Sequence, residues 1–94
     1  MQTDYAERAV ERTNAPSDRP TEVLDVRELG PPGPLTETLE TLPDLADEAV
    51  LVQVNDRAPR HLYPKLGDRG YAYETVADGD ATLTAIWRQA DEEG

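Results

Sequence analysis

The stretch LDVRELGPPGPLTETLETL, residues 24–42, contains the strongest local structural signals in the chain. A short apolar run ends at Val26, and three prolines and two glycines follow within residues 30–34. Proline is tolerated in the first turn of a helix, where its missing amide has no intrahelical partner, so we expect a helix to begin near Pro32 to Pro34. Apolar residues then recur at helical spacing: Leu35, Leu39 and Leu42. The stretch predicts a strand that passes through a rigid turn into an amphipathic helix.

The segments that flank this stretch predict a second strand and a second helix. TEVLDV (21–26) alternates as a strand, and AVLVQV (49–54) is almost continuously apolar, which is typical of a central strand covered by helices. A second helix is expected over roughly residues 59–66. We expect it to be short, bent or partly 3₁₀, because Pro64 removes an interior hydrogen bond.

The C-terminal third of the chain predicts a hairpin. YAYETV (71–76) and ATLTAIWR (81–88) alternate as strands, and Asp78 and Gly79 between them are typical turn residues. The complete order is β-α-β-α-β-β. It predicts an α+β fold, a two-layer α/β sandwich in which both helices lie on one face of a four-stranded mixed sheet.

The two ends of the chain are expected to lie outside this domain, which we place at residues 21–90. Residues 1–20 predict a flexible tail with a frayed helix, because only Tyr5, Ala9 and Val10 offer an apolar face. The alternative is a helix that docks on the domain. Residues 91–94 predict a disordered acidic end.

The composition is strongly acidic, with 20 Asp and Glu against 9 Lys and Arg and a net charge of −11. The acidic residues are dispersed, and Lys65 is the single lysine beside eight arginines. Such a surface suits a salt-rich cytoplasm, where a Debye length of about 3 Å at 1 M salt screens the self-repulsion. We therefore expect a cytoplasmic protein of a halophile.

Several functional classes are excluded by what the sequence lacks. Nucleic-acid binding requires clustered basic residues, which this charge opposes. There is no cysteine, and hence no disulfide, thiolate nucleophile or thiolate metal site. No apolar run approaches the roughly 20 residues of a membrane span, and the N-terminus lacks the apolar core of a signal peptide.

Residues 25–34, DVRELGPPGP, resemble the motif Asp-x-Arg-Gly-Leu-x-Cys-Pro-x-Pro of TusA/SirA-like sulfur carriers. Glu28 replaces the glycine of that motif, and Pro31 stands where the cysteine would be. The motif positions that match are Asp25, Arg27, Leu29, Pro32 and Pro34. The resemblance implies a sulfur-carrier fold that cannot hold a persulfide, because proline has neither a thiol nor an N–H group.

A second resemblance, over about residues 22–88, is to the family DUF2249. Its members read Asp-x-Arg-Glu-Leu and later Val-Asn-Asp-x-x-Pro-x-x-Leu-Tyr, as residues 25–29 and 54–63 do here. Ala58 departs from the family, in which many members have Asp before the proline. Since alanine cannot cap a helix, we expect Asn55 or Asp56 to cap the second helix instead.

The polar residues at the two predicted strand-to-helix junctions are the best candidates for a binding site. They should lie together at the carboxyl edge of the parallel strands, where open α/β sheets bind ligands. The candidates are Arg27, Asn55, Asp56, Arg57, Arg60 and His61. They could receive a carboxylate or phosphate. The alternative, which we favour, is that the polar residues cap the helix and the arginines pair with surface acids.

His61 alone could act as a general acid or base, but no nucleophile with a fixed spacing accompanies it, and an exposed or helix-capping histidine is the favoured interpretation. A metal site is not expected. Three aromatic residues, Tyr71, Tyr73 and Trp87, either form a partner-binding patch on the open sheet face or belong to the core.

We expect a non-enzymatic accessory or binding module without a cofactor, present as a monomer or weak homodimer. It would recognise a small anionic ligand or a protein partner at the strand-helix junctions or the open sheet face. The alternative is a docking or regulatory component of sulfur or redox metabolism that does not itself carry a persulfide. No nucleic acid and no membrane is expected as a partner.

Overall fold

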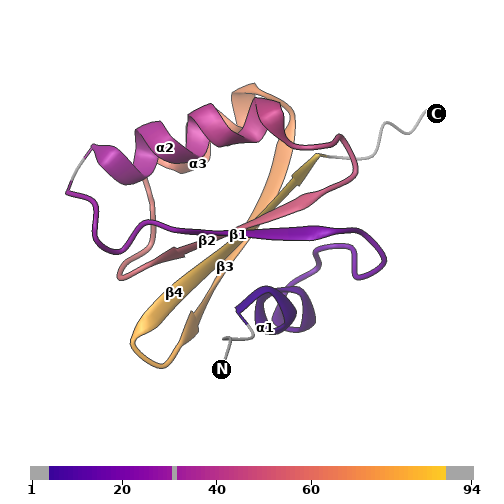
Figure 1. The fold of residues 1–94 in the computed structure, drawn as a ribbon, viewed down its shortest axis with the longest axis horizontal. Helices are drawn as coiled ribbons and strands as arrows, with labels where there is room; N and C mark the ends of the chain where they lie inside the picture. The colour runs from indigo at the N-terminus through magenta and orange to yellow at the C-terminus, as the bar shows by residue number, and fades with distance from the viewer. Residues whose placement is uncertain (1–4, 31, 89–94) are drawn as a thin grey trace.

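The computed structural model describes residues 5–30 and 32–88 of the chain (Figure 1). In chain order, the helices are α1 (Tyr5–Arg12), α2 (Gly33–Thr41), the 3₁₀ helix η1 (Leu42–Asp44) and α3 (Leu62–Asp68). The strands are β1 (Thr21–Asp25), β2 (Val50–Asn55), β3 (Tyr71–Asp78) and β4 (Ala81–Arg88). From residue 21 onwards the order is β-α-β-α-β-β, which confirms the expected order of elements.

The four strands form one mixed sheet in the order β1-β2-β4-β3. β1 runs parallel to β2, with Val23 opposite Val52, whereas β4 is antiparallel to both β2 and β3. The hairpin between β3 and β4 turns at Gly79, whose φ of 61° lies in the left-handed region that glycine tolerates. The α+β class, the mixed sheet and the closing hairpin are therefore confirmed.

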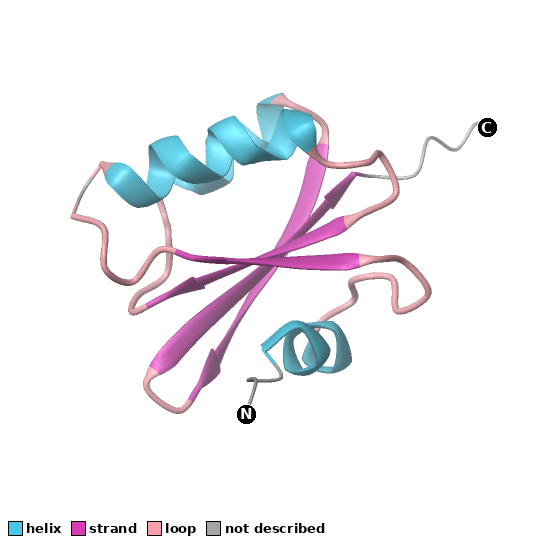
Figure 2. Cartoon of the chain, viewed as in Figure 1, coloured by secondary structure: helices cyan, strands magenta, loops and turns pink. Residues whose placement is uncertain are grey.

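The helices cover both faces of the sheet, but unequally (Figure 2). α2 and α3 lie together on one face, as predicted, and α1 lies on the opposite face. Successive side chains of β2 therefore face different helices. Leu51 points to α2 and α3, while Val50, Val52 and Val54 point to α1.

Each face has its own apolar cluster. Beneath α2 and α3 the buried residues are Leu42, Leu51, Leu62, Leu66 and Ile86. Beneath α1 they are Val50, Val52, Val54, Ala81, Leu83 and Ala85, together with Ala9 and Ala15 from the N-terminal segment. Every residue of β2 is buried, as expected for the central strand.

The second expected helix begins three residues later than the sequence suggested. Residues 59–61 form a turn, in which the Leu62 amide donates to the carbonyl of Pro59 at 3.0 Å, and α3 starts at Leu62. Pro64 is therefore the third residue of α3, where its missing amide costs no intrahelical bond. α3 is short, with seven residues, but the expected conflict with an interior proline does not arise.

In the structure the N-terminal segment carries α1, which lies against the sheet, as in the second of the two alternatives for this segment. Ala9 is fully buried against the sheet, and Tyr5 and Val10 pack beside it. The side chains of β2 and β4 that α1 packs against are Val50, Val52, Val54, Ala81, Leu83 and Ala85. The acidic end predicted for residues 91–94 lies outside the described residues. In the part of the chain that is described, no helix is long and apolar enough to cross a membrane.

Candidate functional site

The candidate site lies where β1 and β2 end. Because these strands are parallel neighbours, their carboxyl ends meet at one edge of the sheet, and the loops into α2 and α3 leave it side by side. An open groove of about 390 Å³ lies between these loops. Its lining includes all six predicted residues: Arg27, Asn55, Asp56, Arg57, Arg60 and His61. The structure thus brings together side chains that are separated by up to 34 positions in the sequence, from Arg27 to His61.

The remaining walls of this groove, which we call the junction groove, are mostly apolar. They are formed by Leu29, Pro32, Pro34, Leu35, Ala58, Pro59 and Leu62. Leu29 is 42 % exposed, an unusual degree for a leucine in this chain, and it faces this concavity from the β1–α2 loop. The proline-rich turn that suggested the start of a helix therefore also forms one wall of the groove.

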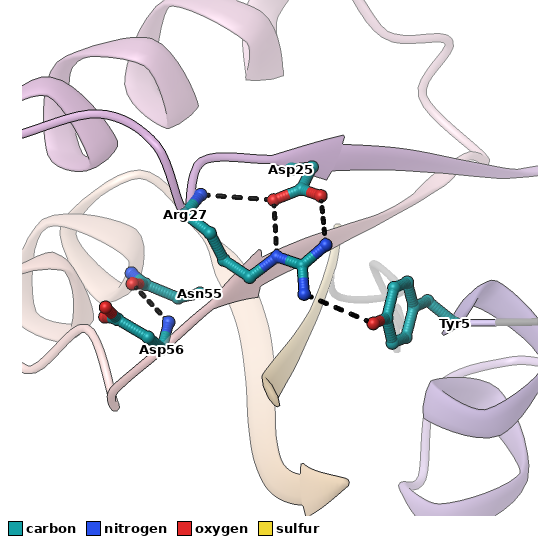
Figure 3. A network of polar contacts seen from close by, with 5 residues as sticks. All are labelled: Tyr5, Asp25, Arg27, Asn55 and Asp56. Carbon is teal, nitrogen blue, oxygen red and sulfur yellow. Dashed lines mark hydrogen bonds and ion pairs between the residues drawn. The ribbon is translucent and has the colours of Figure 1, made fainter. Parts of the chain in front are cut away.

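Arg27 lines the junction groove, but its guanidinium is engaged elsewhere (Figure 3). Nε donates to Asp25 Oδ1 at 3.0 Å and Nη2 to Asp25 Oδ2 at 2.7 Å, a bidentate pair. Nη1 donates to the hydroxyl of Tyr5 at 3.4 Å, and the guanidinium carbon lies 5.5 Å from the centre of that ring. Arg27 therefore fits the favoured expectation of an arginine paired with an acid.

The electrostatics of this pair follow from its geometry. The hydrogen bond from Arg27 is the main reason why the pKa of Asp25 lies below its ordinary value, and slight burial opposes the shift. The same contact raises the pKa of Arg27. Asp25 is thus held as a carboxylate and keeps the Arg27 guanidinium beside β1.

Asn55 and Asp56 do not cap α3, contrary to the expectation for these residues. The N-cap position of α3 is His61, and no side chain makes a cap hydrogen bond there. Asn55 Oδ1 instead accepts from the amide of Asp56 at 2.7 Å, and its Nδ2 donates to Gln53 Oε1 at 3.2 Å (Figure 3 shows the first contact). Asn55 fixes the start of the β2–α3 loop.

Two residues that support this loop escaped the sequence analysis. Gln53 Nε2 donates to the hydroxyl of Thr38 on α2 at 2.8 Å, and both side chains are fully buried. A buried chain of hydrogen bonds thus runs from Thr38 through Gln53 and Asn55 to the backbone of Asp56. The signal was a glutamine within the apolar run AVLVQV, but its partner on α2 could not be identified from the sequence.

Two arginines and one histidine are left at the mouth of the junction groove: Arg57, Arg60 and His61. All three residues are exposed. Arg57 makes a contact with the neighbouring Asp56, at 3.4 Å, but its side chain is still 80 % exposed. These side chains can turn toward a ligand at little cost, because no buried contact holds them.

The three predicted aromatic residues do not form one surface. Trp87 packs on the apolar cluster beneath α1, whereas Tyr71 packs on the cluster beneath α2 and α3. Tyr73 stacks on Tyr63 of α3, with ring centroids 4.6 Å apart. The three residues therefore do not share one face of the sheet: Trp87 lies on the side of α1, and Tyr71 and Tyr73 lie on the side of α2 and α3.

The chemical groups available in the junction groove follow from its lining residues. Among its described lining residues, none carries a hydroxyl or a thiol. Within residues 5–30 and 32–88, no group of three or more His, Cys, Asp or Glu side chains could hold a metal ion. Pro31, which occupies the position of the sulfur-carrier cysteine, lies outside the described residues.

Residues 23–88 match the model of a protein family described as uncharacterized conserved protein (DUF2249). The match covers most of the chain and spans both strand-to-helix junctions, so the chain belongs to this family. α1 and the segment that follows it precede the matched region. No curated protein and no solved structure matches the chain.

Proposed function

We propose that this member of DUF2249 is a non-enzymatic binding module, and that the junction groove holds an anionic small molecule with an apolar body. The observation that carries the proposal is the composition of the groove. Apolar walls from the two loops lead to a mouth that carries Arg57, Arg60 and His61, in a chain whose net charge is −11.

The two halves of the groove suit the two halves of such a ligand. Ligand sites are mostly apolar concavities of about 300–1,000 Å³ with a few polar groups that fix orientation, and this groove falls in that range. An arginine fork can take a carboxylate with two parallel hydrogen bonds. A carboxylate whose hydrocarbon tail contacts Leu29, Leu35 and Pro59 would use both features.

The negative charge of the whole molecule restricts where on its surface an anion can bind. The overall field repels an anion, so attraction is confined to the mouth where the arginines outnumber Asp56. Salt screens the long-range repulsion but weakens contacts at the mouth much less, because the Debye length is still about 3 Å at 1 M. Binding at high salt is therefore expected to depend on the apolar walls as well as on the arginines.

Calorimetric titration with hexanoate tests the proposal, and two matched probes separate its parts. Hexanol lacks the charge, and sulfate lacks the apolar body, so both should bind more weakly than hexanoate. Arg60→Gln should reduce hexanoate affinity by about tenfold, the loss of one charge-assisted contact. Arg69→Gln, at the far end of α3, is the control and should change nothing.

Two outcomes would refute the proposed site. Hexanoate that binds no more tightly than hexanol would show that the cationic mouth contributes nothing. An equal loss of affinity in the Arg60 and Arg69 variants would show that only the overall charge matters.

We further propose that the fold is TusA-like and that the protein comes from a halophile. The order β-α-β-α-β-β with α2 and α3 on one face supports the first, together with the motif at residues 25–34. The dispersed acidic composition and the ratio of arginine to lysine support the second. The alternative role beside a persulfide-carrying partner stays a prediction.

A further inference from the structure

A second surface of the molecule, the sheet face beneath α1, has no role in the proposed function. α1 precedes the family match at residues 23–88, yet it covers an apolar strip on β2 and β4. The strip consists of Val50, Val52, Val54, Ala81, Leu83 and Ala85, and all six are buried. Ala9, with no exposed surface, lies against the strip, and Tyr5 and Val10 flank it.

The helix that covers this strip is basic where it meets the edge of the sheet. Arg8 and Arg12, one turn apart, both reach Asp78 on β3, at 2.9 and 3.4 Å. Beyond the helix, the amide of Asn14 donates to Glu74 Oε1 at 2.9 Å. β3 therefore offers carboxylates beside an apolar strip, an arrangement complementary to a basic amphipathic helix.

The contacts that hold α1 in place are individually weak. α1 has eight residues, and isolated helices shorter than about 12–15 residues are marginal in water. Both arginine side chains are about half exposed, so their ion pairs with Asp78 contribute little. A longer helix of the same chemistry would bury the same strip and could replace α1. Without any cover, the strip would be the kind of apolar patch that marks protein–protein contacts.

We propose that this face of β2 and β4 is a docking site for an amphipathic helix of a partner protein, and that α1 occupies the site until such a helix displaces it. The partner helix has alanine-sized residues at the centre of its apolar face, since Ala9 sets the approach of the helix to the sheet. It carries two basic residues one turn apart, which replace Arg8 and Arg12 at Asp78.

A full-length chain with Ala9→Glu tests this proposal, because a carboxylate cannot be buried unpaired against the strip and α1 must leave it. The probe is a fluorescein-labelled peptide of residues 3–16, TDYAERAVERTNAP, which carries the stated chemistry. Fluorescence anisotropy should show that it binds the Ala9→Glu chain at least tenfold more tightly than the wild-type chain. The same peptide with Arg8→Gln and Arg12→Gln should bind only slightly more weakly, because exposed ion pairs contribute little, whereas the peptide with Ala9→Glu should lose most of this affinity.

Circular dichroism and Trp87 fluorescence test whether the variant is folded. If it is unfolded, a chain with Arg8→Glu and Arg12→Glu takes its place. These substitutions repel α1 from Asp78 without changing the apolar strip. A folded variant that does not bind the peptide overturns the proposal, and so does equal binding to variant and wild type. A wild-type dimer in sedimentation that Ala9→Glu abolishes would assign the face to a second copy of this chain and would also overturn it.

Discussion

Gln53 is a buried polar residue that links two elements bordering the junction groove. Its amide joins Thr38 on α2 to Asn55 at the end of β2, and no buried side-chain nitrogen or oxygen among the described residues lacks a partner. Gln53→Leu would leave the hydroxyl of Thr38 and the amide of Asn55 buried without partners. Such groups cost about 1–3 kcal/mol each to leave unsatisfied.

We therefore expect Gln53→Leu to lower the free energy of unfolding by about 2 kcal/mol or more. Urea denaturation measures this change. In the double variant with Thr38→Val, which removes one of the abandoned groups, part of the loss should be recovered. A Gln53→Leu chain as stable as the wild type would show that the hydrogen-bonded chain does not hold the loop.

Asp25 gives the molecule a pH-dependent contribution to stability. Because Arg27 lowers its pKa in the folded state, the carboxylate stabilises the fold above its unfolded pKa of about 3.9. This contribution is lost as the pH falls through the lowered folded value. Asp25→Asn should therefore be less stable than the wild type at pH 7, and the gap should close in strong acid.

The effect is expected to be small, since the side chains of Arg27 and Asp25 are 39 % and 45 % exposed to solvent. Urea denaturation of both chains at neutral and at strongly acidic pH measures the gap. Asp47→Asn is the matched control, because Asp47 is 90 % exposed and lies 3.8 Å from Arg88. A stability difference between Asp25→Asn and the wild type that stays constant with pH would contradict the stabilising role of the Asp25–Arg27 pair. An equally large difference for Asp47→Asn would contradict it too.

The sequence could place the candidate residues but could not assign their partners. Because parallel strands end at a common edge, the predicted order of elements was enough to place Arg27 and His61 at one site. The orientation of the Arg27 guanidinium depends on Asp25 and on Tyr5, and Tyr5 belongs to a helix that was expected to be mobile. The role of Asn55 depends on Gln53 and Thr38, contacts that only the packing of α2 on β2 determines.

One glycine in α2 and one in α3 allow a paired test of local packing. At Gly33, the first residue of α2, an added Cβ would lie 2.9 Å from Leu29 Cβ, so the wall of the junction groove would have to move. At Gly67 in α3 an added Cβ would meet nothing within 4 Å. Replacing glycine by alanine within a helix stabilises the helix by about 0.5–1 kcal/mol. At Gly33 the clash with Leu29 opposes this gain, and at Gly67 no clash does.

Gly67→Ala should therefore raise the free energy of unfolding by up to about 1 kcal/mol, whereas Gly33→Ala should lower it by about 1 kcal/mol or more through overpacking. Denaturant unfolding of the two variants measures both changes. Equal stabilisation by the two substitutions would mean that the loop at Leu29 yields freely and does not form a fixed wall.

The boundaries of the elements were predictable where a single local signal dominates, and less so elsewhere. The turn at Gly79 and the start of α2 near its prolines were both found, because each follows from backbone sterics. α3 begins later than predicted because the turn at residues 59–61 precedes it, so that Pro64 falls in the first turn. The docking of α1 depends on an apolar strip formed by two distant strands, which no local pattern reveals.

For the whole molecule, the acidic composition predicts how stability responds to salt. With a net charge of −11 on 94 residues, self-repulsion opposes the compact state at low ionic strength. Screening increases as the Debye length falls from about 10 Å at 0.1 M to about 3 Å at 1 M. The melting temperature should therefore rise steeply with KCl over this range and more slowly above it.

Differential scanning calorimetry measures this response. Sucrose at matched osmolality is the control, because it stabilises by exclusion from the protein surface without screening charge. A melting temperature that falls with KCl, or one that rises equally in sucrose, would contradict the proposal that the surface is adapted to a salt-rich cytoplasm.

The arrangement of the sheet separates the two surfaces to which we assign binding roles. The junction groove is lined by the loops that follow β1 and β2 and by the first residues of α2 and α3. The apolar strip lies beneath α1, which is on the opposite face of the sheet from α2 and α3 (Figure 1). The parallel crossover and the hairpin followed from the order of elements. The insertion of β4 between β2 and β3 depends on pairing between distant segments, which the alternation of residues does not specify.

Titration of the full chain with hexanoate, followed in amide ¹⁵N–¹H spectra, tests the proposed binding site most directly. The site predicts saturable shifts at the two loops, centred on Leu29, Ala58, Arg60 and His61, while the β3–β4 turn at Gly79 stays unchanged. Shifts that do not saturate, or that spread equally to Gly79, would contradict it.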